Sequence, residues 1–190
     1  MFAKMKLKSL QKKAKNLYDK RERGSNVNVK TEIRVLKDLA KLYAKHQFHK
    51  KYPDALVHAH EYYRAAAGLN DAEAQFILGE IQLEKAKFWQ QWHEGDYGEP
   101  VHEAYAQMYF KEAFALLSEA DQNGYPLAKR LHGLAYINGW GVAIDQDKGF
   151  KMVVDSIEEA NEWDKATEIF KALGLNKPEF FSAMMQMRRK

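Results

Sequence analysis

One phrase of small residues occurs twice in this chain, 54 positions apart. When Ala74 is aligned with Ala128, Gly79 falls on Gly133 without a gap, and the segments that precede the two copies align at the same offset. A helical unit that repeats with small residues at fixed spacing is typical of stacked helix pairs, because one pair alone cannot bury its apolar face. The repeat therefore predicts architecture more directly than it predicts chemistry.

The composition favours an all-α fold. The 190 residues are enough to bury a sizeable core as one domain or a short solenoid, and 46% of them are hydrophobic. Only 4 prolines and 11 glycines interrupt a chain rich in helix-forming residues. The chain has no cysteine, which excludes disulfide bonds, thiolate nucleophiles and cysteine-ligated zinc. The charged first residues hold no apolar stretch long enough for a signal peptide or membrane span, so we expect a soluble, cytoplasmic protein.

Apolar periodicity and turn residues divide the chain into expected helices. A basic amphipathic helix precedes a turn near Gly24, a linker runs to Lys30, and Asp71 is a candidate N-cap. After the linker, the expected helices are 31–47, 54–67, 72 to at least 86, 104–120, 126–137, 147–160 and 163–173, followed by a short C-terminal helix. Three parts are thus expected: a basic N-terminal helix or leader over 1–24, a helical repeat domain over 31–175, and a C-terminal capping helix rich in Phe and Met over 176–190.

The repeat residues resemble a known family, the Sel1-like repeat, a relative of the tetratricopeptide repeat. The most complete copy has Gly124, Ala128, Gly133, Gly139, Gly141, Val142 and Asp147, and the other good copy has Ala59, Tyr62, Tyr63, Ala66, Ala67, Ala74, Leu78 and Gly79. The resemblance spans about residues 55–170, with Gly149 standing where the repeat usually has alanine. It implies an α-solenoid of Sel1-like, tetratricopeptide-like helix-turn-helix repeats. By the same resemblance the protein is a non-enzymatic adaptor or scaffold that holds a protein or peptide partner in a groove.

An insertion interrupts the regular repeat. Two later copies lie 36 residues apart, so the offset of 54 contains 18 extra residues, which fall mostly within 85–102. Such insertions map to a loop or an extended helix on one face, which is often the binding face. We expect Phe88, Trp89 and Trp92 to anchor a partner, because large aromatic side chains bury much area at low entropic cost. Packing of these rings into the solenoid core is the alternative. Lys129 and Arg130, on the first helix of the best repeat, are further expected contacts.

No catalytic or metal-binding pattern is evident. The closest histidine pairs do not form a ligand set: His58 and His60 would point about 200° apart on a helix, and no H-E-x-x-H motif occurs. Phosphate-binding and nucleophile-elbow motifs are also missing. We therefore expect no metal, no cofactor and no enzymatic activity. A helical enzyme with its site between repeats would need a buried polar cluster that the sequence does not show.

The basic N-terminal segment supports an alternative function. Residues 1–24 hold nine lysines and arginines against two acidic residues, a net charge of +7, whereas the remainder carries −3. Such a segment can bind nucleic acid or another acidic surface, although a solvated helix face is the simpler explanation. Few aromatic residues accompany these charges, which makes nucleic acid the weaker choice. The candidate polyanion-binding residues are Lys4, Lys6, Lys8, Lys12, Lys13 and Lys15.

Overall fold

The computed structural model describes residues 2–45, 52–178, 180, 182 and 185, and within this part of the chain the fold is all-α, as the composition predicts. The chain divides into two compact units, Met1–Leu78 and Gly79–Lys190. We call them the N-terminal and the C-terminal unit. The boundary falls inside helix α5 (Ala72–Glu94).

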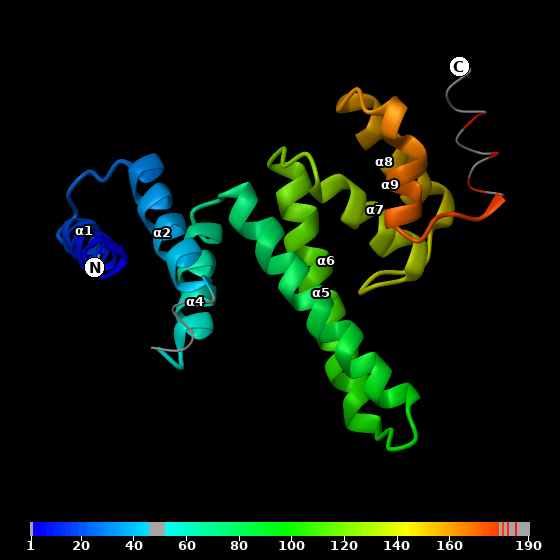
Figure 1. The fold of residues 1–190 in the computed structure, drawn as a ribbon, viewed down its shortest axis with the longest axis horizontal. Helices are drawn as coiled ribbons and strands as arrows, with labels where there is room; N and C mark the ends of the chain where they lie inside the picture. The colour runs from blue at the N-terminus through cyan, green and yellow to red at the C-terminus, as the bar shows by residue number, and fades with distance from the viewer. Residues whose placement is uncertain (1, 46–51, 179, 181, 183–184, 186–190) are drawn as a thin grey trace. The chain divides into compact units, whose positions relative to one another are not determined.

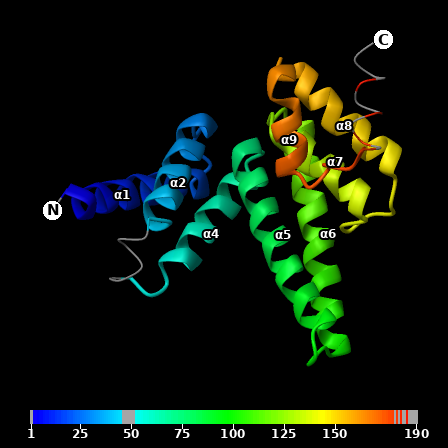
Figure 2. The same cartoon turned by 45° about the vertical axis from the view of Figure 1, so that its right-hand side comes forward.

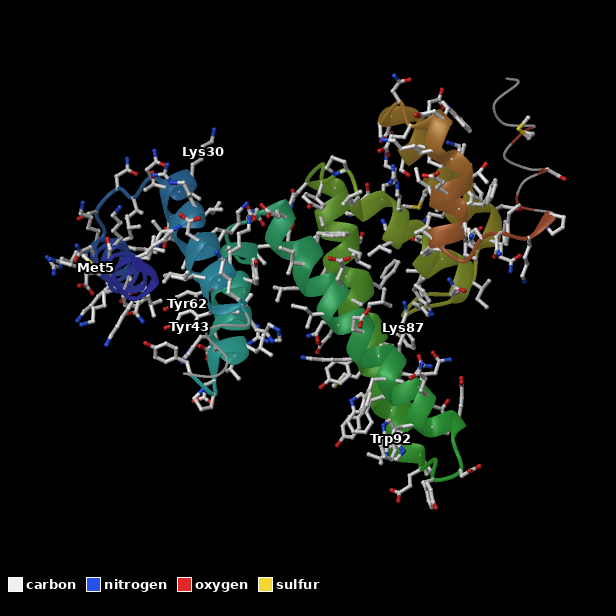
Figure 3. All side chains as sticks on the ribbon, in the orientation of Figure 1. Met5, Lys30, Tyr43, Tyr62, Lys87 and Trp92 are labelled. Atoms are coloured by element: carbon white, nitrogen blue, oxygen red, sulfur yellow. The ribbon has the colours of Figure 1, made fainter. Side chains whose placement is uncertain are left out.

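The N-terminal unit contains α1 (Phe2–Glu22), α2 (Val29–Tyr43), α4 (Ala55–Ala67) and the first turns of α5. The apolar stripe of α1 is buried: Leu7 and Leu10 pack into one core cluster with Val35 and Leu39 of α2. The basic helix is therefore folded into this core through one side and presents its other sides to solvent. Figure 3 shows Tyr43 and Tyr62 next to each other in this unit, where their rings stack with centroids 5.9 Å apart.

Helix α2 differs from its predicted bounds at both ends. It begins at Val29 rather than Thr31, because the Asn28 side chain is the N-cap and accepts a hydrogen bond from the Thr31 backbone nitrogen at 2.9 Å. It ends at Tyr43, not near Gln47, because Tyr43 is its last buried residue and the two residues that follow are exposed. Residues 46–51 lie outside the described residues.

Ion pairs join α2 to the start of α5 within the N-terminal unit. The Lys37 ammonium lies 3.0 Å from Asp71 and 2.6 Å from Glu73, and Lys41 lies 2.7 Å from Glu73. Hydrogen bonds from the two lysines hold the pKa of the Glu73 carboxyl below its ordinary value. Asp71 also caps α5, as predicted, by accepting a hydrogen bond from the Ala74 backbone nitrogen at 2.9 Å. One short acidic segment thus starts a helix and ties it to its neighbour.

The C-terminal unit comprises the rest of α5, α6 (Pro100–Gln122), α7 (Ala128–Asn138), α8 (Gln146–Glu159), η1 (Trp163–Lys165) and α9 (Ala166–Ala172). Its largest core cluster joins α7, α8 and α9 through residues such as Leu134, Val153 and Phe170. The Phe180 ring stacks on Phe150 at 5.5 Å, so the start of the expected capping segment covers this cluster. Most of the remaining residues of that segment lie outside the described part.

The 18 extra residues lengthen two helices. Helix α5 continues to Glu94 and α6 begins at Pro100, four residues before its predicted start, leaving only residues 95–99 as a turn. Figures 1 and 2 both show α5 and α6 side by side, with their connecting end projecting beyond α7 and α8. Pro100 can be the first residue of α6 because proline is well accepted at the first helical position. The insertion therefore forms the far part of a helical hairpin.

Two glycines set the spacing of α7 and α8. A Cβ atom on Gly133 would lie 2.6 Å from the Gly149 carbonyl oxygen, and a Cβ on Gly149 would collide with the Gly133 carbonyl. The two backbones thus touch where side chains would otherwise stand. Gly149, which departs from the alanine of the Sel1-like pattern, is the reciprocal half of this contact.

Replacement of Gly133 by alanine should destabilise the C-terminal unit. We expect Gly133→Ala to lower its free energy of unfolding by about 2 kcal/mol, because overpacking against backbone exceeds the ~1 kcal/mol gained from helix propensity. Urea unfolding followed by circular dichroism measures the change. Gly95→Ala is the control, since its Cβ would make an ordinary 3.4 Å contact. Equal stability of the two variants would contradict the close crossing.

Candidate interaction surface on the α5–α6 hairpin

The far part of the α5–α6 hairpin exposes several large apolar side chains. Phe88 is 51% exposed and Trp92 is 48% exposed, on one face of α5 because they are four residues apart. Figure 3 shows Trp92 toward the connecting end of the hairpin. We call the exposed set the hairpin aromatic surface; it consists of Phe88, Trp92, Tyr97, Val101, Tyr105 and Met108.

Trp89 supports this surface from beneath. Its ring stacks on His102 at 5.4 Å and lies 5.0 Å from the Tyr105 ring, which joins α5 to α6. It also packs, half-buried, against the core cluster that includes Leu83 and Phe110. His102 is held in turn by the Glu99 backbone N–H, which donates to its Nδ1 at 3.2 Å. The exposed rings are therefore carried on a packed base.

The structure thus separates the three aromatic residues that the sequence singled out. Phe88 and Trp92 face solvent with ring centroids 6.1 Å apart, whereas Trp89 packs. Sequence reasoning missed Tyr97, Val101, Tyr105 and Met108. A signal was present for the last three, because Val101, Tyr105 and Met108 recur at intervals of four and three residues, the spacing of one helix face.

Negative charge dominates this part of the hairpin. Between Lys87 and Lys111 the chain has no lysine or arginine, but it has four exposed carboxylates, at Glu94, Asp96, Glu99 and Glu103. The part of α5 just before this segment does contain cations that lie over aromatic rings. Lys87 Nζ is 4.6 Å from the Trp140 ring centroid, and Lys85 Nζ is 5.4 Å from that of Tyr109.

Lys129 and Arg130 lie on α7 and bind groups on and just after α8. Lys129 Nζ contacts both Glu159 oxygens, at 2.6 and 2.7 Å, and this hydrogen bonding raises the pKa of the Lys129 ammonium above its ordinary value. The Arg130 guanidinium pairs with Glu162, and its Nε donates to Ser156 Oγ at 3.2 Å. The structure does not bring these two side chains to the hairpin aromatic surface; it gives each an ion pair within the helix stack.

Two buried polar side chains of the C-terminal unit, His132 and Ser156, each make a polar contact within that unit. His132 Nδ1 lies 2.9 Å from Asp121 Oδ2, between the Phe114 and Tyr136 rings, and Ser156 Oγ donates to the Val153 carbonyl at 2.6 Å. These contacts do not pair the serine with the histidine. Within the described residues, no group of three or more potential metal ligands occurs.

Helix α1 presents a basic surface to solvent. All six lysines at positions 4, 6, 8, 12, 13 and 15 are exposed, and within the described part of the chain none of them forms an ion pair. Arg21 differs, since it pairs with Glu32 of α2. A groove of about 450 Å³ lies between α1, α2 and α4, with Leu17 and Tyr62 in its lining and Lys15 among the lining cations. Among the residues that the structure describes, every helix is too short or too polar to cross a membrane.

Comparison with known proteins finds a structural neighbour of low similarity. A solved structure of a Sel1 repeat protein from Oxalobacter formigenes is similar to this chain, with 15% sequence identity, a match over 96% of this chain and 87% of that chain, and a TM-score of 0.28. A TM-score this low adds nothing about function. No family model and no curated protein matches the chain.

Truncation of Trp89 should cost more stability than truncation of Trp92. We expect Trp89→Ala to lower the free energy of unfolding by ~2 kcal/mol, because it removes stacking and core contacts from a half-buried ring. Trp92→Ala should cost less than about 1 kcal/mol, since its ring contributes little to the core. Urea unfolding of both variants tests the difference. Equal losses would show that Trp92 packs as firmly as Trp89.

Proposed function

We propose that this chain is a non-enzymatic interaction module that binds a protein partner through the hairpin aromatic surface. The observation that carries the proposal is the exposure of Phe88 and Trp92 on a packed helical base. Exposure of apolar side chains to water is unfavourable, so a contiguous group of them on a protein surface commonly marks a binding site. Tryptophan and tyrosine are also the side chains that most often dominate binding energy.

The geometry supports a preorganised contact. Trp89 and His102 fix the two helices beneath the exposed rings, so these side chains lose little freedom when a partner binds. We assign the direct contacts to Phe88, Trp92 and Tyr105. For Trp89 we propose a supporting part, and for Lys129 and Arg130 a part in joining α7 to α8 and the turn that follows it.

Removal of the two exposed rings should abolish partner capture. The test compares immobilised wild-type chain with a Phe88→Ala/Trp92→Ala variant in native cell extract, with retained proteins quantified by mass spectrometry. We expect at least one retained protein to fall about tenfold or more, as for loss of an interface hot spot. Leu127→Ala is the control, because Leu127 is also 45% exposed in the same unit but lies outside the surface.

Circular dichroism must show that the double variant keeps its helices. If every protein retained by wild type and by Leu127→Ala is also retained by the folded double variant, the proposed surface is wrong.

A second function, binding of nucleic acid or another acidic surface, is favoured by the exposed lysines of α1. Because the apolar stripe of this helix is buried, its lysines point outward and can reach phosphates without unfolding. Lys4→Gln, Lys8→Gln and Lys12→Gln combined should weaken binding to duplex DNA or to anionic lipid vesicles and flatten its salt dependence. Lys165→Gln with Lys171→Gln, also exposed, is the control. Binding that ignores both salt and the triple substitution would exclude α1.

A further inference from the structure

The charge around the hairpin aromatic surface restricts the chemistry of its partner. Glu94, Asp96 and Glu99 lie at or next to the turn that joins α5 and α6, all exposed, and Glu103 follows one helical turn into α6. Residues 88–110 contain no balancing lysine or arginine. The whole C-terminal unit has 13 basic residues against 18 acidic ones. A partner that approaches this end of the hairpin meets negative charge, which favours a cation.

The exposed rings favour a cation for an independent reason. The negative face of an aromatic ring attracts ammonium and guanidinium groups, most strongly for tryptophan. This unit already uses the interaction three times: Lys85 over Tyr109, Lys87 over Trp140, and Lys148 over Tyr136 at 3.9 Å. In the described structure no such cation covers Phe88, Trp92 or Tyr105. These rings are partly exposed, on the part of the hairpin that carries the four carboxylates.

We propose that the partner segment bound by the hairpin is basic and amphipathic, with arginine or lysine alternating with apolar residues. The inference rests on the proposed function and specifies its partner. The cations lie over the Trp92 and Tyr105 rings, with the carboxylates of the turn compensating their charge. The apolar residues pack on Phe88, Val101 and Met108, which supply exposed hydrophobic area beside the rings. An acidic or neutral peptide can make the apolar contacts but not the contacts between cations and rings.

A direct binding measurement tests the charge requirement. The probe is a fluorescein-labelled synthetic peptide of repeated Arg-Leu-Lys-Ser, titrated with the full chain and followed by fluorescence anisotropy. We expect saturable binding, weakened about tenfold by Trp92→Ala with Tyr105→Ala. Combined Glu94→Gln, Asp96→Asn and Glu99→Gln should weaken it to a similar extent and reduce its salt dependence. The control variant, Glu158→Gln with Glu168→Gln, removes exposed carboxylates elsewhere in the unit and should bind like wild type.

Two matched peptides separate the contributions. Replacement of the basic residues by glutamate should abolish binding, and replacement of leucine by serine should weaken it. Equal binding of the basic and the glutamate peptide would overturn the proposal, as would equal loss with the control variant. The chain could instead bind a second copy of itself. Self-association that is lost when either the hairpin carboxylates or the α1 lysines are substituted would assign the surface to that second copy and overturn the proposal.

The capture experiment distinguishes an incorrect partner chemistry from an incorrect binding surface. In the capture experiment, one outcome is a protein that Phe88→Ala/Trp92→Ala loses but the variant with three neutralised carboxylates retains. This outcome keeps the aromatic surface as the binding site but contradicts a basic partner. If every protein that wild type retains is also retained by both variants, the surface itself is rejected. Loss from both, with retention by the control variant, supports a basic partner.

Discussion

The contact between the backbones of α7 and α8 sets the geometry of the C-terminal unit. At Gly133 and Gly149 each helix occupies the space where the other would carry a side chain, so the two axes approach closely. That spacing lets Val153 and Ile157 reach the core shared with α9, and it places Lys129 and Arg130 within reach of Glu159 and Glu162. Ion pairs and apolar contacts alike depend on the absence of two Cβ atoms.

The hairpin departs from this compact arrangement. Along its far part the aromatic side chains divide by depth: Trp89 joins the core between α5 and α6, while Phe88 and Trp92 remain half exposed. Stacking of Trp89 on His102 fixes the pair of helices and so fixes the exposed rings as well. A rigid base beneath exposed rings lowers the entropic cost of binding, which is why the projecting part of the fold is the better candidate site than the tightly packed helix stack.

Several residues show which features of the fold follow from the sequence and which do not. The helix stack was predictable because a repeat of small residues at fixed spacing is typical of stacked helix pairs, and Asp71 caps α5 as its position indicates. The sequence predicts the start of α2 two residues late because Asn28 and Thr31 are both acceptable caps, and only the hydrogen bond between them identifies Asn28 as the cap. Arg130 looked like a surface cation, but Glu162, 32 residues away along the chain, binds its guanidinium. An ion-pair partner so far along the chain leaves no local pattern in the sequence.

By itself the sequence determined the all-α class, the repeat with its small residues, and the location of an aromatic insertion. These follow from periodicity and composition, which are local properties of the chain. Only the tertiary structure decided that the insertion lengthens two helices, that Trp89 of α5 packs against Tyr105 of α6, and that Phe88 and Trp92 stay exposed. The physical reason is that exposure depends on which residues of a neighbouring helix cover a ring, and that pairing is fixed by packing between segments distant in sequence.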